Sequence, residues 1–307
     1  MFRCSFVAVV ATAAWSEALV DADGDAALRG AAAPSAAFPT SYVCSYRIVK
    51  TFPHDGDAFT QGLAFDEDGT LYESDGMYRE SRVRRVDVAT GSSFQATHNA
   101  HAEFGEGLTV VGDKLVQLTW RERTLIEYDK RTLAKLRTVR QPVHEGWGLA
   151  ADGDTLYMTD GGAELRTFAA GTYDPLDAHT VRDPRLQHLP VDGLNELEFV
   201  DGQVWANIYP MRHHKASNCV ARIDPKTGFV VGWIDFSGLV EMEREVVRRH
   251  RLDYVLNGLA FHPATRTLYV TGKKWGSMHQ VELVETDLGT DHVRKTCNLY
   301  MPLAKKP

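Results

Sequence analysis

The sequence predicts an all-β fold, a five-bladed β-propeller with antiparallel four-stranded blades, and three observations predict it. An apolar phrase centred on leucine occurs as FTQGLAF (59–65), EGLTV (106–110), WGLAA (147–151), NELEF (195–199) and NGLAF (257–261). A second apolar run follows each phrase after a polar turn, and a third run often follows the second. A repeat of roughly 40–60 residues with three or four strands is typical of a propeller blade.

The second runs repeat the same hairpin order. They are TLYESDG (70–76), KLVQLTW (114–120), TLYMTDG (155–161), QVWANIY (203–209) and TLYVTGK (267–273). Asp-Gly or Gly-Asp pairs, which are hairpin signals, stand at 68–69, 112–113, 153–154 and 201–202. A generic antiparallel sandwich does not explain this recurrence. The strand YRIVKT at 46–51 precedes the first unit and is expected to close the ring with the last blade.

The residue that leads into each Gly-Leu or Glu-Leu pair varies while the leucine stays. The leading residues are Gln61, Glu106, Trp147, Asn195 and Asn257. The first strand of a propeller blade lines the central channel, so these side chains are expected to converge at its mouth, with the leucines packed between blades. The sequence therefore predicts a site built from one position in each blade.

Composition excludes several kinds of partner. The 307 residues carry a net charge of −7, with a pI near 5.9 and 44% hydrophobic residues. This balance argues against a nucleic-acid-binding or polybasic membrane surface, so no nucleic acid partner is expected. Beyond the N-terminus no segment approaches 18 consecutive apolar residues, and we expect a monomer without a membrane span.

The N-terminus is expected to be a processing sequence. Residues 1–20 combine Arg3 with a short apolar stretch and small residues, which is typical of a secretory signal peptide; a disordered Ala-rich tail is the alternative. Residues 21–41 form an Ala- and Pro-rich linker, and residues 42–307 a single propeller domain. With such a signal peptide, the protein is expected to be secreted. The charged segment 241–255 is expected to be a helical insertion or a long excursion.

Three cysteines remain after Cys4, which lies in the expected signal. Cys44, Cys219 and Cys297 fit no zinc-binding spacing. Cys44 directly precedes the first strand and Cys297 lies near the chain end, so a Cys44–Cys297 disulfide is expected, with Cys219 free. Closing a loop of roughly 250 residues would stabilise the fold by about 3–5 kcal/mol in the chain-entropy model.

Nine motifs resemble the plant and bacterial type of glutaminyl-peptide cyclotransferase (glutaminyl cyclase). In family order, and over nearly all of residues 46–283, they are FPHDGDAFTQGL, LYESDGMY, FGEGLT, QLTW, GWGL, LNELEFVDGQVWAN, RIDPKTGFVVGWID, LNGLAF and VTGKKW. The resemblance implies a five-bladed propeller, in agreement with the repeat count. It also implies that the N-terminal Gln of a peptide attacks its own side-chain amide, releasing ammonia and leaving pyroglutamate. Peptides or proteins with N-terminal Gln are the implied partners.

That reaction needs a proton shuttle and an enclosed pocket. Glu106 is the predicted shuttle, and Lys273 is predicted to hold Glu106 ionised or to stabilise the developing oxyanion. The neutral amides suited to bind the substrate are Gln61, Asn195 and Asn257. The aromatic lining implied by the family consists of Phe59, Phe104, Trp120, Trp147 and Tyr209.

The chain departs from the family pattern at two positions. Tyr209 stands where the family commonly carries Trp, and Gly276 where it usually has Pro. The resemblance therefore does not extend to the pocket wall at Tyr209 or to the loop at Gly276.

Other chemistries have weaker support. His98 with His101, and His213 with His214, lack a third ligand at a fitting spacing, so no catalytic metal is expected. No cofactor is required, while a structural cation in the channel stays open. A secreted non-catalytic propeller that binds peptides or sugars is the alternative function. A propeller lactonase would need several convergent ligands, and only Glu106 and Glu196 stand out.

Overall fold

The regular secondary structure of the described residues consists almost entirely of β-strands. The computed structural model describes residues 38–209, 218–243, 254–297 and 299. The expected signal peptide and the linker up to residue 37 lie outside the described residues, as do His213, His214 and residues 244–253 of the charged segment. Within the described ranges, no helix is both long and apolar enough to cross a membrane.

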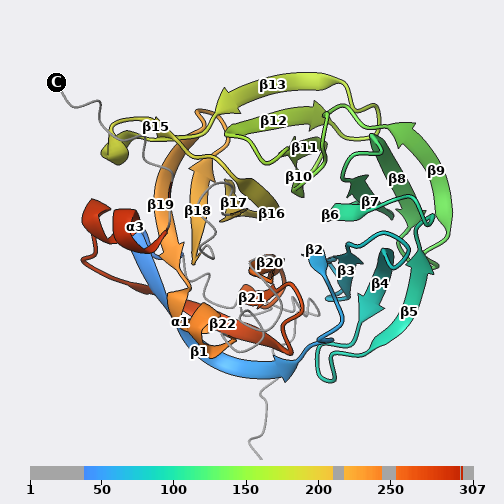
Figure 1. Cartoon of the computed structure of the whole chain (residues 1–307), viewed down its shortest axis with the longest axis horizontal. Helices are drawn as coiled ribbons and strands as arrows, with labels where there is room; N and C mark the ends of the chain where they lie inside the picture. The colour runs from blue at the N-terminus through green and yellow to red at the C-terminus, as the bar shows by residue number, and fades with distance from the viewer. Residues whose placement is uncertain (1–37, 210–217, 244–253, 298, 300–307) are drawn as a thin grey trace, which may run out of the picture. The chain divides into compact units, whose positions relative to one another are not determined.

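Three sheets each contain four sequential antiparallel strands (Figure 1). The first consists of β2 (Thr60–Phe65), β3 (Leu71–Asp75), β4 (Arg82–Val86) and β5 (Ser93–His98). The second consists of β6 (Gly105–Val111), β7 (Lys114–Thr119), β8 (Thr124–Asp129) and β9 (Lys135–Arg140). The third consists of β10 (Leu149–Asp152), β11 (Thr155–Met158), β12 (Glu164–Ala169) and β13 (Pro175–Thr180). The first two strands of each sheet coincide with the expected phrase and second run.

The remaining strands form one ten-stranded sheet. Its main path runs β16-β17-β18-β19-β1-β22-β21-β20. The bounds are β16 (Leu194–Val200), β17 (Gln203–Ile208), β18 (Cys219–Asp224), β19 (Phe229–Asp235), β20 (Leu256–His262), β21 (Thr267–Gly272), β22 (Ser277–Glu285) and β1 (Val43–Pro53). At its edge lie β14 (Arg182–Asp183), the 3₁₀ helix η1 (Pro184–Leu186) and β15 (Leu189–Pro190).

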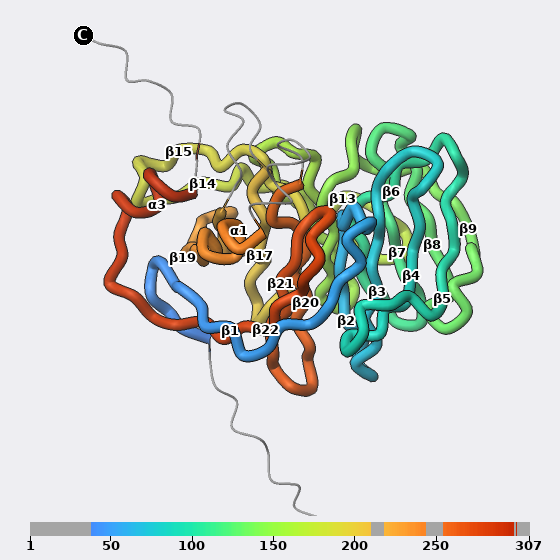
Figure 2. The backbone as a smooth tube through the Cα atoms, turned by 60° about the horizontal axis from the view of Figure 1, so that its bottom comes forward, coloured from blue at the N-terminus to red at the C-terminus, as the bar shows by residue number. Residues whose placement is uncertain are grey.

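Strand β1 ties the beginning of the chain to its later part. It pairs antiparallel with β22, as expected for residues 46–51, and lies beside it in Figure 2. Its first residues also pair in parallel with β19, with Val43 opposite Trp233 and Cys44 opposite Ile234. This second pairing, which was not expected, joins two groups of four strands into one sheet.

Burial separates the inner strands from the outer ones. All six residues of β2 are buried, whereas most residues of β5, β9 and β13 are exposed. Figure 1 shows β2, β6, β10, β16 and β20 around a common centre, with β5, β9 and β13 at the periphery. The inner strands are buried because they have packed neighbours on both faces, so their leucines pack in the core and the polar residues among them are enclosed as well.

Each inner strand contacts the next, and β20 contacts β2, so that the series closes on itself. Glycine allows this close approach. A Cβ added at Gly62 would lie 2.4 Å from the Leu108 nitrogen, one at Gly107 2.6 Å from the Leu149 nitrogen, and one at Gly148 1.9 Å from the Asn195 carbonyl oxygen. The Gly-Leu pair thus recurs because the glycine lets the backbone of the next inner strand come close.

Gly148→Ala should destabilise the fold by about 1–3 kcal/mol or more, because the new methyl group has no space beside Asn195. The measurement is the free energy of unfolding in denaturant. Gly276→Ala is the matched control, because nothing lies within 4 Å of a Cβ at that position. Equal stability of the two variants would contradict the packing argument.

The disulfide differs from the expected one. Cys219, the first residue of β18, is bonded to Cys297, which directly follows helix α3 (Thr290–Thr296). Cys44 is free and buried in β1 between β19 and β22. The predicted Cys44–Cys297 bond is therefore wrong, because α3 brings the chain end to β18 rather than to β1. Helix α1 (Ser237–Met242) includes the first two residues of the charged segment 241–255.

Candidate active site

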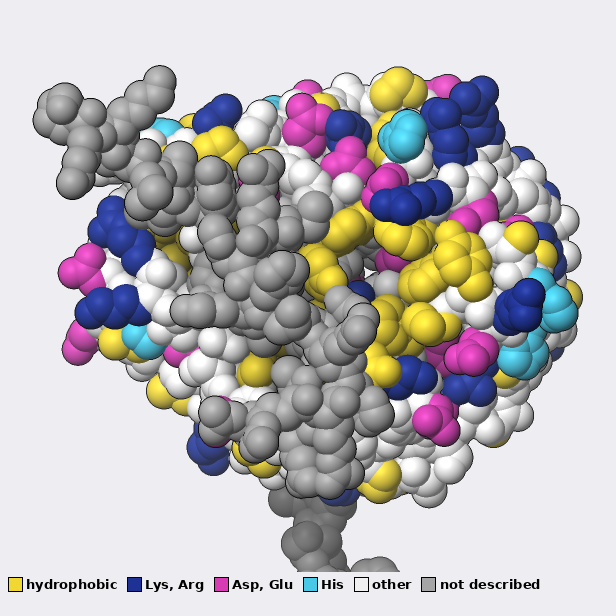
Figure 3. Space-filling view, in the orientation of Figure 1, with side chains coloured by type: hydrophobic (Ala, Val, Ile, Leu, Met, Phe, Trp, Pro, Cys, Tyr) yellow, Lys and Arg dark blue, Asp and Glu magenta, His cyan; other side chains and the backbone are white. Residues whose placement is uncertain are grey.

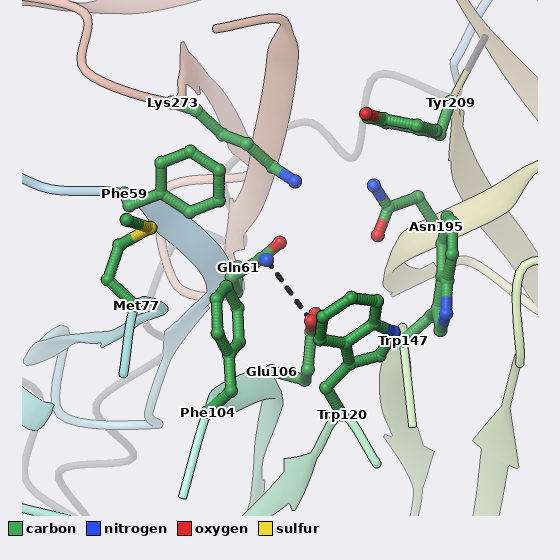
Figure 4. A pocket seen from close by; sticks show the side chains of 10 residues that line it. All are labelled: Phe59, Gln61, Met77, Phe104, Glu106, Trp120, Trp147, Asn195, Tyr209 and Lys273. Carbon is green, nitrogen blue, oxygen red and sulfur yellow. Dashed lines mark hydrogen bonds between the residues drawn. The ribbon is translucent and has the colours of Figure 1, made fainter. Parts of the chain in front are cut away.

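A pocket of about 450 Å³ lies at the centre of one face. Hydrophobic side chains border this hollow in Figure 3, and Figure 4 shows the side chains that line it. The lining consists of Phe59, Gln61, Met77, Phe104, Glu106, Trp120, Trp147, Asn195, Tyr209 and Lys273. Inner strands β2, β6 and β16 and the segment before β10 each contribute lining residues. No residue of β20 is among them, but Lys273 reaches the pocket from the end of the neighbouring strand β21.

Irregular pairing of the inner strands aims the polar side chains. The register shifts between Thr60 and Gly62, between Gly105 and Leu108, and between Leu194 and Leu197. Gln61, Glu106 and Asn195 lie within these shifts. Since a bulge bends a strand and redirects its side chains, these three residues turn toward the pocket.

All the predicted site residues line the pocket except Asn257. Asn257 is fully buried and lies beside Gln61, donating from Nδ2 to the Thr60 carbonyl oxygen at 2.9 Å and to Gln61 Oε1 at 3.3 Å. It therefore supports Gln61 rather than facing the cavity. Met77 lines the pocket and was not predicted. It sits in the turn after β3 with φ of 93°, where no strand periodicity marks it.

Aromatic rings form the walls. The rings of Phe59 and Phe104 meet edge to face at 6.2 Å, and Phe104 contacts Trp120 at 5.6 Å. Across the cavity, Trp147 and Tyr209 meet edge to face at 5.5 Å. Such rings enclose a small polar group and exclude water from around it. Tyr209 thus forms part of the wall, although the resemblance did not extend to this position.

Lys273 reaches the cavity between two of these rings. Its side chain is almost fully buried, and Nζ lies 4.8 Å from the centroid of Phe59 and 5.3 Å from that of Tyr209. Figure 4 shows the amine pointing into the pocket. The rings' π-faces attract the ammonium and hold it in place.

Glu106 is the buried carboxyl group of the pocket. Its Oε1 accepts a hydrogen bond from Gln61 Nε2 at 3.2 Å. Burial raises the pKa of Glu106 well above its ordinary value, and Glu122 and Glu145 add to the rise, while Lys273 opposes it. Desolvation therefore outweighs the attraction of Lys273, which lowers the pKa of Glu106 without restoring its ordinary value.

Among the described residues, Glu106 is the carboxyl group that lines the pocket. Glu196 is buried and accepts from the Leu259 backbone N–H at 3.0 Å, so it links inner strands β16 and β20. Across the described ranges, no group of three or more His, Cys, Asp or Glu side chains is placed to hold a metal ion. His98 and His101 are exposed.

Fold and pocket together define a class: a strand-rich protein whose inner strands bring a carboxyl group and a lysine into one aromatic cavity. A family model described as glutamine cyclotransferase matches residues 24–283. A curated glutaminyl-peptide cyclotransferase of Arabidopsis thaliana is 38% identical over 252 residues, covering 81% of this chain and 75% of that protein. The crystal structure of Myxococcus xanthus glutaminyl cyclase matches with a TM-score of 0.72 and 32% identity, covering 80% of this chain and all of that one. The chain belongs to the glutamine cyclotransferase family.

Proposed function

We propose that the protein is a glutaminyl-peptide cyclotransferase, an acyltransferase-type enzyme that converts the N-terminal Gln of peptides to pyroglutamate with release of ammonia. One observation carries the proposal: Glu106, bonded to Gln61, lies in the same enclosed aromatic cavity as Lys273. The named activities of the relatives agree with it.

We also propose that the architecture is a five-bladed propeller. Three blades are the four-stranded sheets, and the other two are β16-β17-β18-β19 and β20-β21-β22-β1. The closed series of contacts from β2 through β6, β10, β16 and β20 supports this reading. In it, β1 is the outer strand of the last blade, and its parallel pairing with β19 makes those two blades one continuous sheet.

The cyclisation is intramolecular, so the protein has only to fold the substrate, move a proton and stabilise charge. The α-amine nitrogen bonds to Cδ of the same glutamine, and the bond from Cδ to the side-chain nitrogen breaks. Glu106 accepts a proton from the attacking amine and returns it to the leaving nitrogen, which departs as ammonia. Lys273 stabilises the negative charge that develops on the amide oxygen.

The raised pKa of Glu106 suits this role. A carboxylate with a raised pKa is a stronger base than an ordinary glutamate and accepts a proton more readily, and its acid form protonates the leaving group. Gln61 orients the carboxylate without adding charge, and Asn257 in turn orients Gln61. Asn195 offers its amide to the polar atoms of the substrate.

The remaining parts of the proposal follow from this chemistry. Nucleophile and electrophile are both in the substrate, so we propose that no cofactor is required. The partners are peptides or proteins with an N-terminal Gln, and the protein acts as a monomer. The Cys219–Cys297 disulfide fits an oxidising compartment, which supports a secreted protein.

The test is incubation of the purified protein with Gln-β-naphthylamide in the presence of a chelator. We expect release of ammonia and formation of the pyroglutamyl product. The same compound acetylated at its α-amine is the control, because it has no free nucleophile and should not react. Binding without product would favour the non-catalytic propeller instead, and activity lost with the chelator would favour a metal-dependent enzyme.

The acid limb of the pH profile should respond to charge near Glu106. Activity is expected to rise between about pH 6 and 8, because the substrate amine, which titrates near 8, must be neutral. Glu106 must also be ionised, and its raised pKa moves that requirement to higher pH. Lys273 lowers the pKa of Glu106, so Lys273→Met should raise that pKa and move the limb to higher pH. Glu122 raises it, so Glu122→Gln should move the limb to lower pH.

The measurement is kcat/KM against pH for the wild type and the two variants on one substrate. The amine contributes equally in all three profiles, so differences between them report the enzyme. Shifts of the same sign in both variants would contradict the assignment of the limb to Glu106.

A further inference from the structure

Two of the aromatic walls are connected through a residue that does not itself line the cavity. Glu145 lies in the loop between β9 and β10, two residues before Trp147. Its Oε2 accepts from Trp120 Nε1 at 3.0 Å and is 3.4 Å from Trp147 Nε1. One carboxylate oxygen thus receives both indole N–H groups, one from the second sheet and one from the segment that enters the third.

The other oxygen of the Glu145 carboxylate accepts a hydrogen bond from Arg121. Arg121 Nε donates to Glu145 Oε1 at 3.1 Å, and the Arg121 guanidinium lies 3.8 Å from the centroid of the Trp120 ring. Trp120 is therefore fixed at its edge by Glu145 and on one face by Arg121. The backbone supports the same arrangement, since Gly146 N–H donates to the Trp120 carbonyl oxygen at 2.9 Å.

We propose that Glu145 is a positioning residue that sets the separation and tilt of Trp120 and Trp147, and so the shape of the slot that receives the substrate glutamine. The inference rests on the proposed function. Each indole has a single N–H donor, and Glu145 accepts from both indoles with one oxygen and from Arg121 with the other. Glutamine at 145 has only one acceptor oxygen and no charge, so it cannot hold both indoles and Arg121 at once, and the rings are held less firmly. Hydrogen bonds to a charged acceptor are directional and strong, and therefore suited to fixing a ring at its edge.

The charge of Glu145 has a second effect that the test must separate from positioning. Glu145 and Glu122 both raise the pKa of Glu106. Glu122, however, accepts from Tyr78 OH at 2.8 Å and from the Phe104 backbone N–H at 3.3 Å, and from neither indole. Glu122→Gln is therefore a matched control, since it removes the same charge and leaves Trp120 and Trp147 in place.

We expect Glu145→Gln to raise KM for a Gln-peptide by about tenfold with a much smaller change in kcat, since misplacing groups that orient a substrate weakens its productive binding. Glu122→Gln should leave KM within about twofold, because glutamine keeps an amide oxygen that can accept from the Phe104 backbone N–H and the side chain bonds neither indole. In a Trp120→Phe, Trp147→Phe background, which lacks both indole donors, Glu145→Gln should have no further effect on KM. Equal KM changes in Glu145→Gln and Glu122→Gln, or an undiminished effect in the double-Phe background, would overturn the proposal.

A second measurement needs no turnover and keeps the proposal separate from the proposed function. Acrylamide quenching of tryptophan fluorescence, taken as the difference between each protein and its Trp120→Phe counterpart, isolates Trp120. Quenching of Trp120 should increase in Glu145→Gln and stay at the wild-type level in Glu122→Gln. Unchanged quenching in Glu145→Gln would overturn the positioning role, whereas an inactive wild type with the expected quenching would contradict only the proposed reaction.

If Glu145→Gln does not fold, Arg121→Gln serves instead. Arg121 is 59% exposed at its side chain, so replacing it leaves the core intact. This change removes the ion pair between Arg121 and Glu145 and the cation–π contact of Arg121 with the Trp120 ring. A smaller rise in KM with increased Trp120 quenching would support the proposal, and wild-type values of both would overturn it.

Discussion

Glu106→Gln is expected to lower kcat by about 10²–10⁴, the usual range for loss of a general acid–base group. Glutamine keeps the shape of the side chain and still accepts the hydrogen bond from Gln61, but it cannot take up or return a proton. KM should change much less, because the aromatic walls and the Asn195 amide remain. Steady-state kinetics on a Gln-peptide provide the measurement.

Two controls make this result specific. Glu122→Gln removes a carboxylate that influences Glu106 but lies outside the cavity, and it should retain most of the wild-type kcat near pH 8. Circular dichroism and thermal unfolding establish that Glu106→Gln is folded. A folded Glu106→Gln protein with a near wild-type rate would remove this residue from the mechanism.

Removal of the Cys219–Cys297 disulfide should produce the largest loss of stability. The bond links residues 78 apart in the chain. In the chain-entropy model, a loop of this length corresponds to about 4–5 kcal/mol of stabilisation. Cys219→Ser combined with Cys297→Ser should therefore lower the free energy of unfolding by roughly this amount under non-reducing conditions.

Cys44→Ala is the control for this experiment. It removes a buried thiol without removing a crosslink, so its effect should be that of a small cavity, about 1 kcal/mol. Peptide mapping without reduction should recover Cys219 joined to Cys297. A double Ser variant as stable as the control would show that the crosslink does not restrict the unfolded chain.

The repeated phrase made much of the fold predictable. Gly62, Gly107 and Gly148 are needed where inner strands approach each other. Each directly precedes a buried leucine, so the Gly-Leu pair is visible in the sequence. The parallel pairing of β1 with β19 was not predictable, because it depends on two residues at the end of a strand. The disulfide was missed for a related reason: nothing near Cys297 shows where α3 packs.

The site was predictable to a similar extent and for the same reason. Gln61, Glu106 and Asn195 occupy one repeated position, so their convergence follows from the repeat. Asn257 occupies that position too, yet it is bonded to Gln61, a detail of rotamer and packing that no periodicity encodes. The raised pKa of Glu106 depends on the full enclosure of its carboxyl group, which only the assembled walls create.

The place of β1 has a consequence for how the protein is made. Its partners in β19 and β22 end at Asp235 and Glu285, so β1 leaves the ribosome long before either exists. At 5–20 residues per second, the wait until residue 285 is roughly 10–50 s. During this time β1 is an unpaired strand, the kind of segment that joins other chains. Arg47 and Lys50, charged residues within it, disfavour such pairing until the last strands emerge and the sheet can close.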